Sequence, residues 1–289
     1  MLAAPVMPDR VFAFFTLSGN RMGHIPRKRF GQNFLQDQGV IYDIVNCIDP
    51  KPGEPLVEIG PGLAALTEPL MARAGHLHVV EIDRDIVSHL QQRFKPEQLT
   101  IHNVDALQFD FGTLAREIAP GSRIRLAGNL PYNISTPLLF HLAEFGDAIA
   151  DMHFMLQKEV VERIAAEPGT ADYGRLSIML QVRFATEYML DVPPGAFYPP
   201  PKVDSAVIRM IPWPTPPWPV DDMPTLEKLV QTAFAARRKT LRNNLRGVVD
   251  DAQLLALELD PAQRPEQITV EQYVRLANWL FAQRGNTAA

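Results

Sequence analysis

Cysteine and long hydrophobic runs are the two features that this sequence most plainly lacks. Cys47 is the only cysteine among 289 residues, which excludes an intramolecular disulfide and is typical of a reducing compartment. No apolar run reaches the roughly 18 to 20 residues that cross a bilayer, so we expect no membrane partner. A formal net charge of −5 argues against attraction of the whole surface to nucleic acid, but it is compatible with a local basic patch. These absences predict a soluble, cytoplasmic protein.

Metal-site and hydrolase signatures are missing as well. No cysteine and histidine spacing matches a metal site, and no Ser-His-Asp or Cys-His arrangement stands out. The apolar stretch "VFAFFTL" (11–17) resembles a signal-peptide core, but no convincing cleavage site follows it. We therefore predict an N-terminal extension over residues 1–25 and assign it no function.

What the chain does contain is an alternation of short apolar runs with amphipathic stretches. Five runs are typical of strands: 55–60, 77–83, 99–105, 123–129 and 151–157. The segments between them have the apolar spacing of helices. Repeated strand–helix units predict an α/β fold with a parallel, doubly wound sheet. Two later runs, 186–192 and 203–210, flank a proline-rich segment and predict an antiparallel hairpin at the sheet edge.

The composition changes abruptly after this sheet. "PWPTPPWP" (212–219) has five prolines in eight residues, which neither a helix nor a central strand tolerates. We predict a sheet domain over 26–211, a stiff linker over 212–222 and a small all-α domain over 223–289.

The stretch "VEIGPGLAALT" (57–67) indicates a small-molecule pocket. Gly60 and Gly62 fall at the turn after the first strand, where a ligand can approach the backbone beside a helix N-terminus. Glu81 and Asp105 end the next two strands, and their carboxylates can accept from ribose hydroxyls and an adenine amino group. Nicotinamide enzymes and S-adenosyl-L-methionine (SAM) enzymes share this pattern. Glu58 favours SAM, because its charge would repel a pyrophosphate but tolerate a cationic amino acid.

An unusual motif, "GNLPYNIS" (128–135), follows the fourth predicted strand. Asn129, Pro131 and Tyr132 place an amide, a rigid backbone and a flat ring within four residues. An amide and a backbone carbonyl offer hydrogen-bonding groups, and a tyrosine ring offers a flat apolar face. The motif therefore raises the question of which group these three features hold together.

The motif "NLPY" resembles the signature of methyltransferases that modify the exocyclic nitrogen of adenine. Four further stretches strengthen the likeness: "RKRFGQNFL" (27–35), "VEIGPGLAALT", "FYPPPKVDSAV" (197–207) and "RRKTLRNNL" (237–245). With them the chain resembles the ribosomal RNA adenine N6,N6-dimethyltransferase family, over roughly residues 26 to 285, and most closely its bacterial small-subunit members. Ala64 departs from the pattern, because many members carry glycine there, and we expect this change to be mild.

The resemblance implies a Rossmann-like SAM-dependent fold and a role for each matching residue. The cofactor site would consist of Asn33, Leu35, Gly60, Gly62, Glu81, Asp105 and Asn129. The catalytic site would consist of Asn129, Leu130, Pro131, Tyr132 and Phe197. In it Asn129 and one carbonyl, that of Leu130 or Pro131, would hold the target amine. Tyr132 and Phe197 would stack on opposite sides of the base.

A basic cluster follows in the C-terminal part. The stretch between Glu227 and Asp250 contains no acidic residue. The basic residues of the cluster within it are Arg237, Arg238, Lys239, Arg242 and Arg246. In a continuous helix, positions 238, 242 and 246 would form one positive stripe. A solvated helix face is the alternative, but like charges in an acidic protein favour contact with RNA phosphates. Residues 27–29 could add a second patch.

Taken with the resemblance, these features predict SAM-dependent N6,N6-dimethylation of two adjacent adenosines near the 3′ end of small-subunit (16S) rRNA. The expected partner is the assembling 30S subunit, and we expect the protein to be a monomer. Three alternatives stay open: the large-subunit dimethyltransferase of macrolide resistance, a non-catalytic nucleic-acid-binding factor that has kept the fold, and a nicotinamide oxidoreductase.

Overall fold

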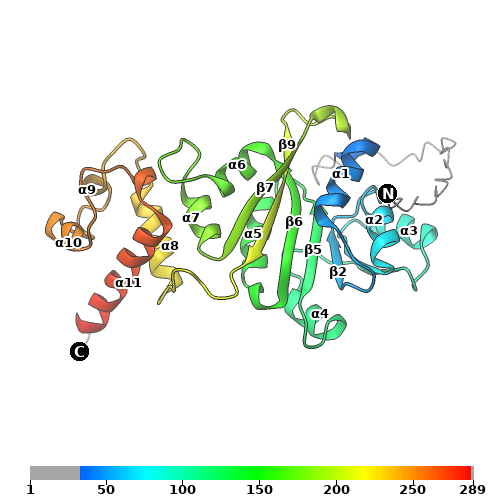
Figure 1. Cartoon of the computed structure of the whole chain (residues 1–289), viewed down its shortest axis with the longest axis horizontal. Helices are drawn as coiled ribbons and strands as arrows, with labels where there is room; N and C mark the ends of the chain where they lie inside the picture. The colour runs from blue at the N-terminus through cyan, green and yellow to red at the C-terminus, as the bar shows by residue number, and fades with distance from the viewer. Residues whose placement is uncertain (1–32, 288–289) are drawn as a thin grey trace, which may run out of the picture.

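A seven-stranded sheet forms the centre of the protein, which the computed structural model describes over residues 33–287 (Figure 1). The strand order is β4-β3-β2-β5-β6-β9-β7. The strands are β2 (Leu56–Ile59), β3 (Leu77–Val80), β4 (Leu99–His102), β5 (Ile124–Asn129), β6 (Ile149–Gln157), β7 (Phe184–Val192) and β9 (Ser205–Pro212). The first five of these run parallel, while β9 is antiparallel to both β6 and β7. The predicted parallel sheet and its antiparallel edge hairpin are confirmed.

The strand order reverses direction between β2 and β5. From β2 the chain adds β3 and β4 on one side, and then returns to place β5 and β6 on the other. In an open α/β sheet, the carboxyl ends of the strands at such a switch point form a crevice that binds ligands. The loops after β2 and β5 therefore belong to the place where a site is expected.

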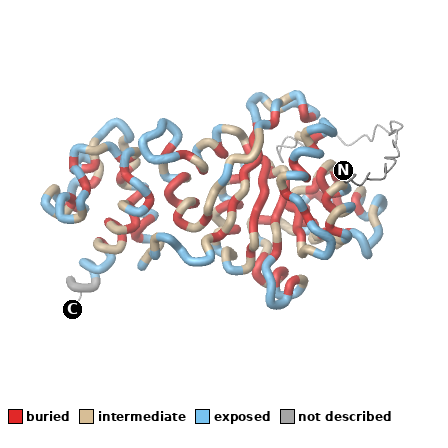
Figure 2. The backbone as a smooth tube through the Cα atoms, viewed as in Figure 1, coloured by how far each residue is buried: buried red, intermediate tan, exposed pale blue. Residues whose placement is uncertain are grey.

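Helices cover both faces of the sheet, as a doubly wound fold requires. One face packs on α1 (Gln38–Ile48), α2 (Thr67–Ala74) and α3 (Arg84–Arg93). The other packs on α4 (Phe111–Ile118), α5 (Ser135–Ala143) and α6 (Lys158–Ala165). The strands between these layers are the most buried part of the chain (Figure 2). Because side chains alternate along a strand, Val57 and Ile59 face the second layer, whereas Leu56 faces the first.

The C-terminal helices form a third apolar cluster at one end of the molecule (Figure 1). They are α8 (Met223–Ala233), α9 (Leu241–Asn244), α10 (Asp251–Ala256) and α11 (Val270–Thr287). Their core also takes in Tyr173 and residues of α7 (Arg175–Gln181), an element that precedes the edge hairpin. No described helix is long and apolar enough to cross a membrane.

The proline-rich segment joins these two parts without regular structure of its own. Residues 213–222, all of them described, form neither helix nor strand. The Trp213 indole nitrogen donates to the carbonyl of Gln181 at 2.9 Å, and Trp218 packs on the C-terminal cluster. The segment is therefore held to α7 at Trp213 and to the C-terminal cluster at Trp218.

A second, two-stranded sheet completes the fold. Its strands, β1 (Phe34–Leu35) and β8 (Phe197–Tyr198), are antiparallel, with Phe34 opposite Tyr198 and Leu35 opposite Phe197. Short 3-10 turns lie at Gly146–Ala148, Pro194–Ala196 and Pro265–Gln267. This small sheet joins the start of the described chain to the loop of the edge hairpin, and it lies beside the pocket described next.

Candidate active site

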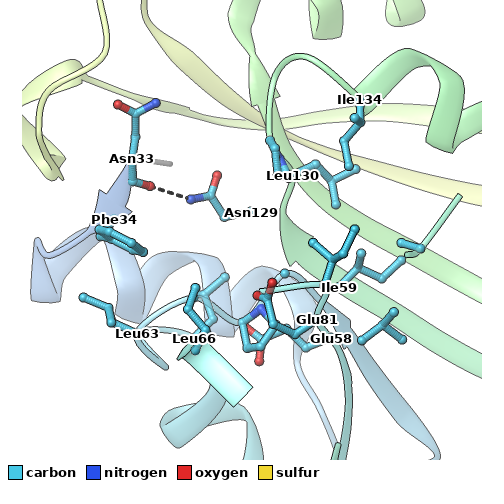
Figure 3. Close-up of a pocket in the computed structure, with 18 of the residues that line it drawn as sticks. Asn33, Phe34, Glu58, Ile59, Leu63, Leu66, Glu81, Asn129, Leu130 and Ile134 are labelled. Carbon is cyan, nitrogen blue, oxygen red and sulfur yellow. Dashed lines mark hydrogen bonds between the residues drawn. The ribbon is translucent and has the colours of Figure 1, made fainter. Parts of the chain in front are cut away.

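A cavity of about 290 Å³ opens at the carboxyl ends of the central strands (Figure 3). Its walls come from β1 and from the loops that follow β2, β3, β4 and β5. Ten residues that the sequence assigned to the site lie together in this wall: Asn33, Leu35, Gly60, Gly62, Glu81, Asp105, Asn129, Leu130, Pro131 and Tyr132. Residues from separate motifs therefore meet at the switch point, and the role of each stays a prediction.

The glycine turn after β2 forms the floor. Gly62 has a φ of 52°, and a Cβ there would lie 3.3 Å from the ring of Phe34. The left-handed backbone and the close ring both favour glycine. Ala64 also adopts a left-handed φ of 71°, a conformation that costs an L-residue roughly 1–2 kcal/mol. The alanine at this position is therefore a strained residue, and the expectation of a mild change needs that correction.

Glu81 lies at the end of β3 and is 8% exposed. Its Oε1 accepts the backbone N–H of Asp83 at 2.8 Å, while Asp83 itself caps α3. Burial raises the pKa of Glu81 to about 7, although backbone N–H donors partly offset this effect. Asp105 is less enclosed, and its Oδ1 accepts the N–H of Leu107 at 3.0 Å. The two carboxyl groups are thus held in place by the loops that carry them.

Glu58 is the most deeply buried acidic group of the wall. It is 1% exposed, and no described residue bonds its Oε2. Burial raises its pKa to about 8, so the carboxyl group is mostly protonated at neutral pH. Glu58 would therefore repel a pyrophosphate less in the folded protein than the sequence suggests.

The amide of Asn129 is fixed from across the pocket. Its Nδ2 donates to the backbone carbonyl of Asn33 at 3.2 Å, the bond dashed in Figure 3. Since only the nitrogen end can donate to a carbonyl, this bond sets which side of the amide carries the oxygen. The carbonyl of Pro131 accepts the N–H of Ile134 at 3.1 Å inside the following turn. The Leu130 carbonyl is therefore the better second acceptor for an amine.

Two neighbours hold the rest of this motif. The Tyr132 hydroxyl bonds the hydroxyl of Ser205 on β9 at 2.6 Å, and Ser205 is fully buried. Gly128 packs directly on β2, where a Cβ would lie 2.3 Å from the carbonyl oxygen of Ile59. The close approach that this glycine allows is thus to the protein's own backbone. Sequence reasoning missed Ser205, although it lies within the quoted "FYPPPKVDSAV" motif.

Phe197 does not lie where a base-stacking residue is needed. It is 4% exposed, belongs to the apolar cluster on the α1 side of the sheet and is not part of the pocket wall. Phe197 pairs with Leu35, a residue of both that cluster and the pocket wall, so Phe197 packs beside the wall and not in it. The prediction that Phe197 stacks opposite Tyr132 is not met in this structure.

The basic stripe is not a continuous helix, so this prediction is wrong. The helix α8 ends at Ala233, residues 234–240 form turns, and α9 contains only Leu241–Asn244. Arg242 forms a two-point ion pair with Asp251, with Nη2–Oδ2 at 2.7 Å and Nε–Oδ1 at 3.0 Å. One member of the basic cluster therefore has an acidic partner, which lies just beyond the stretch between Glu227 and Asp250 that contains no acidic residue.

Arg237 is also committed within the fold. Its Nη2 donates to the carbonyls of Ala171 and Tyr173, in the loop before α7. Three of the predicted RNA-binding residues are exposed on turns around α9: Arg238, Lys239 and Arg246. Arg238 and Arg246 form no ion pair with a described residue. The proposed patch at residues 27–29 and the extension over residues 1–25 lie outside the described chain.

Comparison with known proteins shows to which family the chain with this pocket belongs. The family model described as "Ribosomal RNA adenine dimethylase" matches residues 23–282. The chain belongs to this family. It is 62% identical over 255 residues to the ribosomal RNA small subunit methyltransferase A of Laribacter hongkongensis, covering 88% of this chain and 96% of the relative. It is also 62% identical to the enzyme of that name from Chromobacterium violaceum, covering 89% and 96%.

Solved structures agree with the fold. A dimethyladenosine transferase from Plasmodium falciparum superposes with a TM-score of 0.71 at 24% identity, over 87% of this chain and 98% of that one. The 23S rRNA methyltransferase ErmE gives 0.66 at 25% identity, over 86% and 100%. The protein is thus a SAM-dependent adenine dimethyltransferase of ribosomal RNA with a Rossmann-like fold. The nicotinamide oxidoreductase alternative is excluded.

Proposed function

We propose that this protein dimethylates N6 of two adjacent adenosines near the 3′ end of small-subunit rRNA, within the assembling 30S subunit. The 62% identity to relatives named small subunit methyltransferase A supports this choice, whereas the 23S rRNA enzyme ErmE is only 25% identical. The protein would act as a monomer in the cytoplasm.

The observation that carries the proposal is the anchored amide of Asn129. Because the Asn33 carbonyl holds Nδ2 at 3.2 Å, Oδ1 is left to accept one hydrogen of the target amine. The Leu130 carbonyl would accept the other. Two acceptors favour a pyramidal nitrogen whose lone pair is less delocalised into the adenine ring, and therefore more nucleophilic. A catalytic base is not required, because the methylated nitrogen is acidic and loses its proton readily.

The pocket fits SAM by the chemistry of its wall. The buried carboxyl of Glu81 suits the ribose hydroxyls, and Asp105 suits the adenine amino group. Gly62 lets the Phe34 ring pack closely against the turn in the pocket wall, and Asn33 would lie at the methionine end. SAM would supply an activated methyl group on its sulfonium. The protein's part is to align the amine with that group, and alignment of this kind is worth up to ~7–11 kcal/mol.

The target base must leave its stack to enter the pocket. Stacking on a Tyr132 ring that Ser205 holds at 2.6 Å would offset part of that cost. Arg238, Lys239 and Arg246 would contact phosphates from the C-terminal end of the molecule. The catalytic part is then the carboxyl-end pocket, and the helical part guides the RNA to it.

The test uses under-methylated small subunits and tritiated SAM. We expect label on two adjacent adenosines near the 3′ end of the rRNA, mapped by primer extension. Labelling of naked large-subunit RNA, with small subunits unmodified, would show that the large-subunit alternative is correct. A protein with Asn129→Ala should fail to label, whereas Asn46→Ala, which removes an exposed amide on α1 outside the pocket wall, should retain most activity. If Asn129→Ala kept full activity while Arg238→Ala abolished function, the non-catalytic binding-factor alternative would be favoured.

A further inference from the structure

Tyr198 is an exposed aromatic residue that the site described above does not use. It is 61% exposed, although the preceding residue, Phe197, is 4% exposed. Single exposed aromatic side chains are common on protein surfaces, so exposure alone indicates nothing. What distinguishes Tyr198 is its position relative to the pocket.

The register of the small sheet places Tyr198 next to a residue of the pocket wall. Tyr198 lies directly opposite Phe34 in the antiparallel β1–β8 pair. Residues directly opposite each other point to the same face, with Cβ atoms roughly 4.5–5.5 Å apart. Phe34 belongs to the pocket wall and lies against the glycine turn (Figure 3). Tyr198 therefore extends the same aromatic face outward from the pocket wall to the rim.

The strand partner of Tyr198 is also next in sequence to the residue that anchors the amide of Asn129. The residue before Phe34 is Asn33, whose carbonyl accepts the Nδ2 of Asn129 at 3.2 Å. A nucleotide whose base reached Asn129 would have its neighbour in the strand at the edge of the pocket, where Tyr198 lies. An aromatic ring at such a place stacks on any base, because every base has a π face.

We propose that Tyr198 is a stacking platform for the nucleotide that flanks the target adenosine. This inference rests on the proposed function, in which the target has an adenosine as its neighbour. While one adenine is held by Asn129 for methylation, Tyr198 would carry the other by stacking on it. The residue would thereby keep the second adenosine close to the pocket until it is methylated in its turn.

The charge of the rim supports stacking as the source of attraction. Lys202 and Asp204 are both exposed on the loop that follows Tyr198, so their charges offset each other. Pro199, Pro200 and Val203 are exposed beside them. A rim of this composition attracts RNA through apolar and π contact, and its contribution should depend little on salt.

The experiment measures methylation kinetics of the full-length protein on under-methylated small subunits. Tyr198→Ala should raise the KM for subunits roughly 5- to 100-fold, the range for loss of one base–aromatic stack, and leave the Kd for SAM unchanged. Tyr198→Phe should restore the KM, because stacking needs the ring and not the hydroxyl. Tyr42→Ala is the matched control, since Tyr42 is 63% exposed on α1 and outside the pocket wall. Its KM should equal that of the wild type.

A second substrate identifies the nucleotide involved. Subunits reconstituted with an abasic site at the neighbour of the target should bind wild-type protein and Tyr198→Ala equally well. Three results would overturn the inference. They are a KM for subunits that Tyr198→Ala leaves unchanged, a rise in KM that Tyr198→Phe also shows, and a rise in KM for Tyr198→Ala that persists on the abasic substrate. A weakened Kd for SAM would do so too, because it would show that Tyr198 only supports the β1 strand. A wild-type protein that left small subunits unmethylated would instead refute the proposed function, and this inference with it.

Discussion

Affinity for SAM should depend on pH through Glu81. The pKa of this group in the free protein is about 7, because burial destabilises its charged form. Accepting hydrogen bonds from two ribose hydroxyls requires the carboxylate. Binding therefore has to remove a proton from every molecule in which Glu81 is protonated, and that fraction grows as the pH falls.

The size of the effect follows from the titration of one group. With a pKa of about 7, the penalty factor is 1 + 10^(pKa − pH), which is about 11 at pH 6 and about 1.1 at pH 8. The Kd for SAM should therefore rise about tenfold between pH 8 and pH 6. Isothermal titration calorimetry in two buffers of different ionisation enthalpy would also detect the proton that is released.

Glu81→Gln supplies the control for this prediction. Glutamine cannot ionise, so the variant should bind about 10- to 100-fold more weakly at pH 8, which corresponds to a hydrogen bond to a charged group. It should also lose the part of the pH dependence that belongs to Glu81. Titration of SAM itself affects both proteins equally and cancels in the comparison. Equal pH dependence in the two proteins would refute the role of Glu81.

Four further predictions concern the core of the site. Asn129→Ala should lower the single-turnover methylation rate about 100-fold or more with little change in the Kd for SAM. If the methylation rate and the affinity for SAM fell together, the motif would serve only to hold the cofactor. The pKa of Glu58, about 8, lies above its unfolded value of 4.5, so its burial costs stability increasingly as the pH rises from 4.5 towards 8. In urea denaturation Glu58→Gln should therefore stabilise the free protein by ~2–3 kcal/mol more at pH 7 than at pH 5, and equal effects at both pH values would contradict this. Gly128→Ala should destabilise by about 3 kcal/mol in the same assay, because its Cβ would lie 2.3 Å from the Ile59 carbonyl oxygen, and a neutral result would mean that β2 and β5 can separate. Ser205→Ala and Tyr132→Phe should slow methylation to the same extent singly and together, whereas additive losses would show that their 2.6 Å contact is not how Ser205 acts.

Much of the pocket was predictable because parallel strands impose a simple rule. Local periodicity located β2, β3, β4 and β5, and the carboxyl ends of parallel strands meet at one edge of a sheet. Gly60, Glu81 and Asp105 each follow a different one of these strands, and Asn129 ends β5, so their assembly in one cavity needed no knowledge of packing.

The residue-level errors arose where distant segments meet. Leu35 and Phe197 pair across 162 positions of sequence, and only the folded chain shows that Phe197 is buried while Tyr198 is exposed. The expected stripe failed for a similar reason, because α8 ends early and Arg242 pairs with Asp251 from the next helix. The predicted stripe assumes one continuous helix. The periodicity of nearby residues does not indicate where tertiary contacts end a helix.

For this protein, the amino-acid pattern was enough to predict the parallel sheet and the motif residues that lie at its carboxyl edge. Those properties depend on strand period and chain order, both of which are local. The folded structure alone decided how the side chains of the motif are held. The Asn129 amide takes its direction from a carbonyl 96 residues away, Tyr132 takes its position from Ser205, and burial sets the proton affinity of Glu58. Orientation and desolvation are properties of packed neighbours, and neighbours exist only once the chain has folded.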